Sequence, residues 1–215
     1  LRDLSRRLIR AHEEERALLA RELHDDITQR LAVLAIDAGR AELAAADEAV
    51  AGTMRSMRET LVRLSEDVHS LAYHLHPSVL TELGLVEALR AECERRARQN
   101  RIEIALDLDP LPDGLGKDAA LCLFRVTQEA LTNVVRHATS AAARVTLRQM
   151  SGGLLLAVRD DGVGFDMKRL GEGGRLGLAS MRERVRLANG TLDIESAPGR
   201  GTAVVAWVPM EGEST

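Results

Sequence analysis

The sequence predicts an α+β protein in two parts: a helical hairpin that forms a dimeric four-helix bundle, followed by an α/β sandwich. Residues 1–76 are almost free of Gly and Pro and carry apolar side chains every three or four positions, which is the helical period. Residues 82–215 mix period-two strand patterns with helical ones and show no regular βαβ repeat. Pro77 ends the last helical stripe, so we place the boundary between the two parts at residues 77–81.

The predicted hairpin consists of two helices of unequal length. One apolar stripe covers residues 4–41 and a second covers residues 54–75. The segment 44–53 interrupts the pattern and supplies Asp47 and Gly52 as turn residues. Because an isolated hairpin leaves part of its apolar surface in water, we expect two copies to pack as a four-helix bundle, and hence a homodimer.

In the second part, the hydrophobic period and the turn residues predict one mixed sheet with helices on one face. The expected elements are a helix at 82–99, a strand at 102–106, a helix at 117–138, strands at 143–149 and 154–160, a glycine-rich loop at 162–177, a helix at 178–189 and strands at 191–196 and 202–208.

Composition excludes several classes of protein. With 45% hydrophobic and 29% charged residues, the chain is neither disordered nor a low-complexity fibre. Aromatic residues make up only 2% and the net charge is −4, so we expect no direct nucleic-acid binding. Cys93 and Cys122 lack metal-ligand spacing and are expected to be free thiols. We expect a cytoplasmic protein, with membrane attachment only through a segment upstream of Leu1.

The first candidate site is His24, in the segment R-E-L-H-D-D-I-T-Q. A neutral imidazole is a nucleophile, and a neighbouring carboxylate such as Asp25 can hold the Nδ1 proton and leave Nε2 free to attack. Gln29 lies four residues after Asp25 and suits the positioning of a water molecule. An ordinary solvated helix face is the alternative interpretation of the same residues.

Four polar or glycine-rich motifs follow in order beyond residue 120. They read E-A-L-T-N-V-V-R-H, V-R-D-D-G-V-G-F, G-E-G-G-R-L-G-L-A-S-M-R-E-R and P-G-R-G-T. The first motif places a carboxylate, an amide and a cation at helical spacing, which suits a Mg²⁺-bound phosphate. Its candidate residues are Glu129, Asn133 and either Arg136 or His137.

The remaining motifs predict the rest of a nucleotide pocket. Asp160 ends a strand, where it can accept a hydrogen bond from an exocyclic amine such as that of adenine, and Gly162 and Gly164 permit a tight turn. The next glycine-rich run leads into a helix, whose N–H groups and dipole favour phosphate. Each motif alone is an ordinary turn, but the four together favour a nucleotide site. None of them is a P-loop or a dinucleotide fingerprint.

In this order, the motifs resemble the Bergerat-fold ATP-binding domain of DNA gyrase, heat-shock chaperones of that class, mismatch-repair ATPases and sensor histidine kinases. The segment E-L-H-D-D-I-T-Q resembles the dimerisation and phosphoacceptor domain of the histidine-kinase subfamily paired with NarL/LuxR-type response regulators. The segment H-L-H-P-S-V-L-T-E-L-G-L-V-E-A-L resembles that subfamily's interdomain connection. The resemblance implies a dimerisation and phosphoacceptor hairpin at 1–76, a hinge at 77–81 and an ATP-binding domain at 82–215.

The resemblance also implies roles for individual residues. His24 would be the phosphorylated histidine, Asp25 its activating base, and Gln29 the residue that positions a water for dephosphorylation of the partner. Asn133 would hold Mg²⁺, with Glu129 beside it. The implied ATP-binding residues are Asn133, Arg136, His137, Asp160, Gly162, Gly164, Gly174, Gly177, Leu178 and Thr202.

The expected activity is therefore that of an ATP- and Mg²⁺-dependent protein-histidine kinase core. It would autophosphorylate, pass the phosphoryl group to an aspartate of a NarL/LuxR-type response regulator, and act as a phosphatase as well. The alternatives are an ATPase of the same fold that works as a conformational clamp, a catalytically weak dimeric scaffold, and a phosphatase-dominant regulator. Two positions differ from the usual family pattern: Asp161, where Asn is common, and Arg175, where a further Gly is common.

Overall fold

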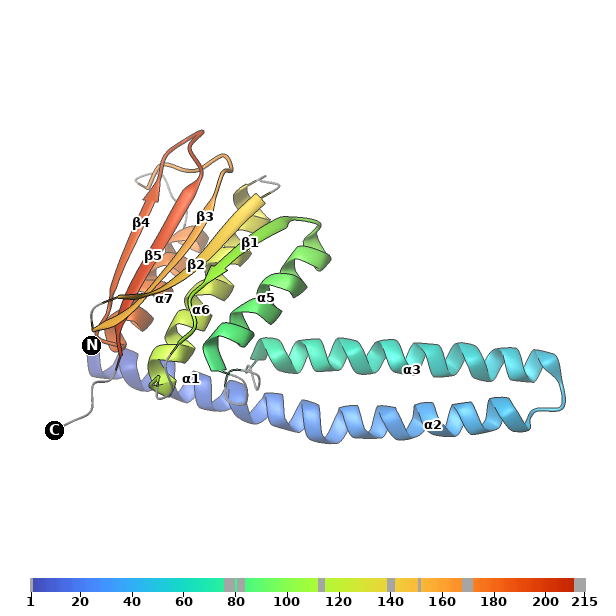
Figure 1. Cartoon of the computed structure of the whole chain (residues 1–215). Coiled ribbons are helices and arrows are strands. Elements are labelled where there is room, and N and C mark those ends of the chain that lie inside the picture. Colours follow the sequence, from blue (N-terminus) through green and yellow to red (C-terminus); the bar gives the residue numbers. More distant parts are fainter. Residues whose placement is uncertain are drawn as a thin grey trace. The chain divides into compact units, whose positions relative to one another are not determined.

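The computed structural model describes residues 2–75, 80, 84–111, 115–138, 142–150, 152–167 and 172–210. The chain divides into two compact units, Leu1–Ser78 and Val79–Thr215, which are drawn in Figure 1. The predicted hinge at 77–81 lies outside the described residues except for Leu80. Among the described helices, none combines the length and the apolar character needed to cross a membrane.

The first unit is a helical hairpin, as the sequence predicts. Its first arm runs continuously through α1 (Arg2–Glu22), a π-helical segment η1 (Leu23–Thr28) and α2 (Gln29–Ala44). Its second arm is α3 (Glu48–Leu75), which packs along α2. The π-helical segment interrupts the expected α-helical period, because a π-turn closes between residues i and i+5 and shifts the following side chains around the helix axis.

The connection between the arms is shorter than predicted. Only residues 45–47 are non-helical, so the expected break at 44–53 is wrong, and Gly52 lies inside α3. The reason is a cap: the carboxylate of Asp47 accepts a hydrogen bond from the N–H of Ala49 at 2.7 Å, which starts the helix at once. A single glycine within the first turns costs about 1 kcal/mol and does not stop it.

A regular seam joins the two arms. Apart from Gly52, the described buried and half-buried positions of α3 follow one another in steps of three and four residues, and they are Ala51, Met54, Arg58, Leu61, Ser65, Val68, Ala72 and Leu75. Near the tip, Glu42 pairs with Arg55 at 2.7 Å and with Arg58 at 3.1 Å across the seam. The hydrogen bonds from Arg55 and then Arg58 lower the pKa of the Glu42 carboxyl. These pairs favour the observed register, since any other would separate the charges.

The second unit contains one mixed five-stranded sheet, in the order β1-β2-β3-β5-β4. The strands are β1 (Glu103–Leu108), β2 (Ala142–Met150), β3 (Gly153–Asp160), β4 (Thr191–Ser196) and β5 (Thr202–Pro209). Strand β1 pairs with β2 in parallel and all other pairs are antiparallel. The predicted strands and the predicted mixed sheet are therefore confirmed.

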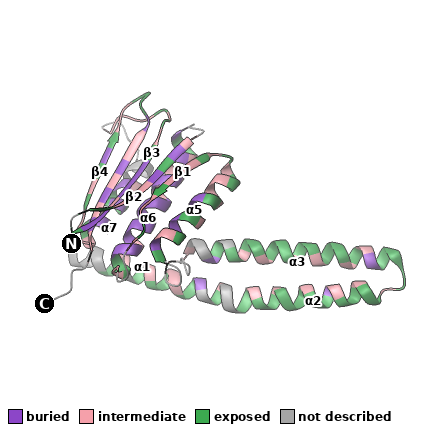
Figure 2. Ribbon diagram, in the orientation of Figure 1, coloured by how far each residue is buried: buried purple, intermediate pink, exposed green. Residues whose placement is uncertain are grey.

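The described helices of this unit cover one face of the sheet (Figure 1). They are α5 (Gly84–Asn100), α6 (Lys117–Asn133) with its π-helical continuation η2 (Val134–Ala138), and α7 (Glu172–Leu187). Fully buried side chains such as Phe124 on α6, Leu156 on β3 and Val185 on α7 fill the layer between the helices and the sheet. Figure 2 shows the buried residues of this layer, and it shows that the described residues of the hairpin are mostly exposed or half-buried.

Helix α7 begins earlier than predicted. The sequence predicts a loop at 162–177 and a helix from 178, whereas the helix starts at Glu172 and ends at Leu187. Leu178, Met181 and Val185 are all buried on one helical face, and the helix continues back from them through the glycines, since each glycine costs only about 1 kcal/mol in a helix.

Candidate functional site

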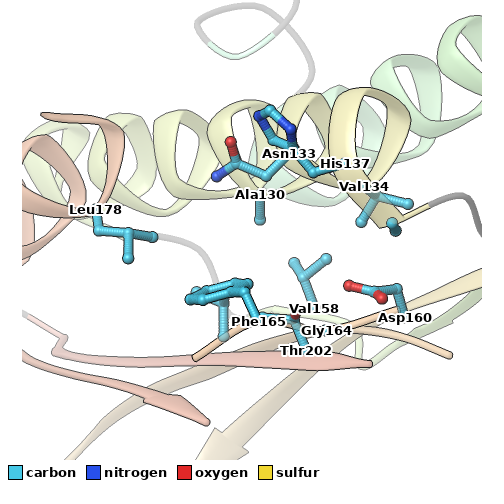
Figure 3. Close-up of a pocket in the computed structure, with 12 residues that line it drawn as sticks. Ala130, Asn133, Val134, His137, Val158, Asp160, Gly164, Phe165, Leu178 and Thr202 are labelled. Carbon is cyan, nitrogen blue, oxygen red and sulfur yellow. The ribbon is translucent and has the colours of Figure 1, made fainter. Parts of the chain in front are cut away.

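A cavity of about 290 Å³ opens between α6, the sheet and the start of α7 in the second unit. Figure 3 shows its walls: α6 and η2 on one side, β3 and β5 on the other. Its lining residues are Ala130, Asn133, Val134, His137, Ala138, Val158, Asp160, Gly164, Phe165, Leu178, Thr202 and Val204. Most of these side chains are apolar, and a few polar groups converge on the space, which is the usual make-up of a small-molecule site.

Asp160 is the main charged group on the sheet side of this cavity. It is the last residue of β3 and pairs in register with Thr202, the first residue of β5. Its Oδ1 accepts a hydrogen bond from the N–H of Gly162 at 2.9 Å, and its carboxylate is turned toward the cavity (Figure 3). Burial raises the pKa of this carboxyl, and hydrogen bonds from Gly162 and Thr202 offset part of the effect. The fold thus keeps a desolvated acceptor at the cavity wall.

Three chain segments meet next to Asp160: the loop after β3, the end of η2 and the turn between β4 and β5. Glycines allow them to approach closely. The loop after β3 is pinned to the end of η2 by the bond from the N–H of Val163 to the carbonyl of Ala138, at 2.9 Å. Gly164 and Gly201 both have positive φ, at 58° and 67°. A Cβ on Gly164 would overlap the carbonyl oxygen of Ala197, and one on Gly201 would overlap that of Asp160. Only glycine fits either position.

The helix side of the cavity carries two of the four residues predicted there. Asn133, the last residue of α6, and His137, in η2, both line the cavity. Arg136 is exposed and is not among the lining residues. The sequence left Arg136 and His137 as alternatives, and the π-turn that follows Asn133 brings His137 to the same cavity as Asn133.

Glu129 lies one helical turn before Asn133, against α7. It is half-buried, and a Cβ on Gly177 would overlap its carboxylate, so the glycine allows α7 to approach α6 closely. Gly174 and Gly177 therefore lie within helix α7 and are not among the cavity-lining residues, which corrects the expected loop at these positions. Leu178, by contrast, lines the cavity.

A buried ion-pair network anchors α6 to α5 near Asn133. Glu92 is fully buried and pairs with Arg95 at 2.6 Å and with Arg96 at 2.9 Å. Arg96 also donates a hydrogen bond to the hydroxyl of Thr132 at 3.0 Å, one residue before Asn133. A buried carboxylate needs such partners, because an unpaired charge in the interior is costly.

The residues predicted for phosphorylation lie in the other unit. The backbone of His24 and Asp25 belongs to η1, and Gln29 is exposed at the start of α2. The side chains of His24 and Asp25 lie outside what the structure describes. Both π-helical segments of the described chain thus coincide with predicted chemical motifs, one at His24 and one directly after Asn133. Such segments occur frequently at functional sites.

The donor set fits a hard divalent cation held jointly with a nucleotide. In the described part of the chain, no three His, Cys, Asp or Glu side chains cluster as a metal site would require. Magnesium, however, commonly uses one or two protein oxygens together with substrate phosphates. The amide oxygen of Asn133 and the carboxylate of Glu129, one turn apart on α6, are ligands of this kind.

Sequence reasoning missed the apolar walls of the cavity. Phe165 lines the cavity, directly follows Gly164 and is one of only two phenylalanines in the chain. An aromatic residue that is so rare in this chain, placed next to a glycine motif, is a signal that the sequence did offer. Ala130, Val134, Val158 and Val204 gave no such signal, because the sequence pattern shows only that they face the interior of the unit. The roles predicted for the polar residues stay predictions.

The cavity and its fold define the class of protein. The family model described as "Histidine kinase-, DNA gyrase B-, and HSP90-like ATPase" matches residues 118–212, which contain every lining residue of the cavity. A second model, described as "Histidine kinase", matches residues 15–80 of the hairpin. The chain therefore carries both domains of the core of a sensor histidine kinase and belongs to this family.

Related proteins have the same two-domain region. The chain is 40% identical to sensor histidine kinase MctS of Rhizobium johnstonii, over 97% of this chain and 46% of that protein. It is 31% identical to oxygen sensor histidine kinase NreB of Staphylococcus carnosus, over 97% of this chain and 60% of that protein. The chain thus spans about half the length of these relatives.

A solved structure shares the fold. The blue-light activated histidine kinase of Erythrobacter litoralis matches with a TM-score of 0.55 and 19% identity, over 86% of this chain and 60% of that one. The likeness supports the order of a helical region followed by a mixed sheet with helices.

The raised pKa of Asp160 predicts a specific dependence of stability on pH. Because the folded chain binds the proton of the Asp160 carboxyl more tightly than the unfolded chain does, this group contributes most to the free energy of unfolding at low pH. That contribution is lost as the pH rises from about 4 through the raised pKa. The nucleotide-free wild type should therefore lose stability relative to Asp160→Asn over this range. Urea unfolding followed through Trp207, the only tryptophan, measures the difference.

The matched control for this experiment is Asp193→Asn, which removes an exposed carboxylate from β4. It should show no such trend, because that carboxylate lies on the surface. A constant difference between wild type and Asp160→Asn at all pH values would contradict the assignment, as would a wild type that gains on the variant with rising pH.

Proposed function

We propose that the chain is the catalytic core of an ATP-dependent protein-histidine kinase that phosphorylates its own His24. The observation that carries this proposal is the cavity with Asp160 at its wall, in a domain of the ATPase family, preceded by a hairpin whose matched region includes His24. One chain therefore contains a cavity for the nucleotide and a nucleophile, and the reaction needs both.

The cavity accounts for nucleotide binding by simple complementarity. The Asp160 carboxylate accepts a hydrogen bond from the exocyclic amine of adenine, and Phe165, Val158 and other apolar groups take up the faces of the ring. Gly162 and Gly164 shape the wall, and Thr202 closes the base site. The cavity recognises the amine of adenine, because the partly desolvated carboxylate gains from a further donor and an oxo group in the same place would only accept.

The phosphate end lies toward the helices. We assign Asn133 and Glu129 to the Mg²⁺ ion, which neutralises phosphate charge when it is bound. His137 and the exposed Arg136 supply nearby donors. The first turn of α7, which includes Gly174, offers backbone N–H groups at a helix N-terminus, where anions are favoured.

The reaction is an in-line displacement. Nε2 of His24 attacks the γ-phosphorus, a P–N bond forms, and the bond from phosphorus to the bridging oxygen of ADP breaks. Asp25 takes the Nδ1 proton and fixes the tautomer of the ring. Because the transition state is loose, positioning and charge neutralisation supply most of the catalysis. Residues 77–81 act as the hinge that lets the ATP-binding domain reach the hairpin.

The phosphoryl group then passes to an aspartate on a NarL/LuxR-type response regulator in the cytoplasm. The match of residues 15–80 to a histidine kinase model supports this partner class. Gln29 positions a water for dephosphorylation of the regulator. One relative, 29% identical, is named signal transduction histidine-protein kinase/phosphatase DegS of Brevibacillus brevis, which agrees with such a second activity.

The working unit is a homodimer, and two lines of exposed apolar residues on the hairpin support it. The line on α3 repeats every seven residues, and its members, Val50, Met57, Leu64 and Leu71, are 46–59% exposed. The line in the first arm, from η1 into α2, has the same repeat and consists of Ile27, Leu34 and Ala41.

Both lines lie on the same side of the hairpin. On α3, each member of the line comes directly before one of the seam positions listed above. In the first arm, the members come directly before the half-buried residues Thr28, Ala35 and Glu42. In two antiparallel helices, positions directly before the seam fall on one common side, so the two lines make one continuous apolar face. A second copy presents an identical face, and packing the two faces gives a symmetric four-helix bundle.

His24→Gln tests the kinase proposal directly. We expect no acid-labile, alkali-stable label after incubation with labelled ATP and Mg²⁺, while ADP binding stays within about twofold of wild type, because the nucleotide seat is in the other unit. His12→Gln, at an exposed position on the same arm, is the matched control and should be labelled normally. Retention of the phosphohistidine label by His24→Gln would refute the assignment.

Leu64→Glu tests the dimer face. This substitution places a charge at the centre of the face in both copies, and we expect the dimer dissociation constant to rise by more than about tenfold. Val62→Glu is the control, since Val62 is similarly exposed, at 43% against 46%, but lies on the opposite side of the seam. Sedimentation equilibrium measures both. Equal weakening by the two variants would contradict this choice of face.

A further inference from the structure

Ser196 makes an unusual number of contacts at the edge of the cavity. It is the last residue of β4 and lies opposite Thr202 in the sheet register. Its Oγ accepts a hydrogen bond from the N–H of Phe165 at 2.9 Å and donates one to the carbonyl oxygen of Gly201 at 2.9 Å. It also lies 3.1 Å from Oγ1 of Thr202. One hydroxyl therefore contacts the residues that carry two cavity-lining side chains, Phe165 and Thr202.

Counting protons limits what these hydroxyls can do. A serine hydroxyl has one proton and two lone pairs. While the proton of Ser196 is donated to Gly201, the short contact with Thr202 is a hydrogen bond only if the Thr202 hydroxyl donates to Ser196. The Thr202 hydroxyl has a second acceptor in reach, the carboxylate of Asp160, to which its side chain also hydrogen-bonds, and its single proton can point to only one of the two acceptors at a time.

The carboxylate of Asp160 has other donors as well. The N–H of Gly162 donates to Oδ1 at 2.9 Å, and the backbone of Thr202 also hydrogen-bonds this carboxylate. A carboxylate offers about four lone-pair sites. If the Thr202 hydroxyl donates to it as well, three sites are occupied and only about one is left for a donor arriving from the cavity. The direction of the Thr202 proton therefore controls how well Asp160 can accept a ligand amine.

We propose that Ser196 is a positioning residue for base recognition: it draws the Thr202 hydroxyl proton to itself and so leaves the Asp160 carboxylate free to accept the amino group of an adenine ring. This inference rests on the proposed function, because it concerns how the same cavity distinguishes adenine from other purines. Ser196 itself is not among the lining residues and acts through its neighbours.

The backbone around the cavity does not depend on Ser196 alone. The N–H of Gly199 donates to the carbonyl of Val163 at 2.6 Å, and the N–H of Val163 donates to Ala138 at 2.9 Å. The sheet register between β4 and β5 adds further bonds. These contacts hold the same three segments together, so removal of one hydroxyl should change the pattern of donors and acceptors more than the shape of the cavity.

The test compares two nucleotides that differ at one position. ADP carries an amino group at purine position 6, and inosine diphosphate carries an oxo group there. Calorimetry on the full chain with Mg²⁺ gives the ratio of the two dissociation constants. For Ser196→Ala we expect the preference for ADP to fall about three- to tenfold, the usual effect of losing one hydrogen bond. Ser196→Thr keeps the hydroxyl and should restore most of the preference.

Thr191→Ala, at the exposed opposite end of β4, is the matched control and should keep the wild-type ratio. If Ser196→Ala weakens both nucleotides equally, or leaves the ratio unchanged with an intact fold, the inference is overturned. If Ser196→Ala does not fold, the ratio for Ser196→Thr decides, and a preference lost in that variant as well overturns it. A wild type that binds both nucleotides equally would also overturn the inference, whereas a wild type that binds neither would overturn the proposed function itself.

Discussion

The carboxylate of Asp160 is held, partly desolvated, at a junction of three chain segments. Asp160 ends β3, the loop after it is tied to the end of η2, and the turn between β4 and β5 closes behind it. Burial makes this charge expensive for the nucleotide-free fold, and its hydrogen bonds recover only part of that cost. If, as we propose, a ligand donates a hydrogen bond to this carboxylate, it recovers more of the cost, so the residue that destabilises the free domain would favour binding.

This constraint explains where the glycines lie. Gly164 and Gly201 occupy positions where a side chain would collide with a backbone carbonyl, and both have positive φ. Gly177 meets a different requirement, the close approach of α7 to Glu129. The glycine-rich motifs are therefore not one flexible phosphate loop. Some are packing positions that bring backbone segments close together, and the cavity exists because those segments meet.

Much of this organisation could be predicted from the sequence, because it depends on local patterns. Apolar periods gave the hairpin and the mixed sheet, and a strand that ends at Asp160 before two glycines gave the acceptor. The start of α7 and the extent of α3 were wrong, because packing of buried side chains and a cap outweighed the low helix propensity of glycine. The hydrogen bonds of Ser196 arise from contacts between distant segments, and neither they nor the π-turns have a signature in the sequence period.

The most direct measurement is a crystal structure of the chain with ADP and Mg²⁺ bound. The account predicts the adenine ring inside the cavity, with its exocyclic amine within hydrogen-bonding distance of the Asp160 carboxylate and its phosphates toward Asn133. A nucleotide bound at another place, or an adenine whose amine meets a group other than Asp160, would contradict the central claim.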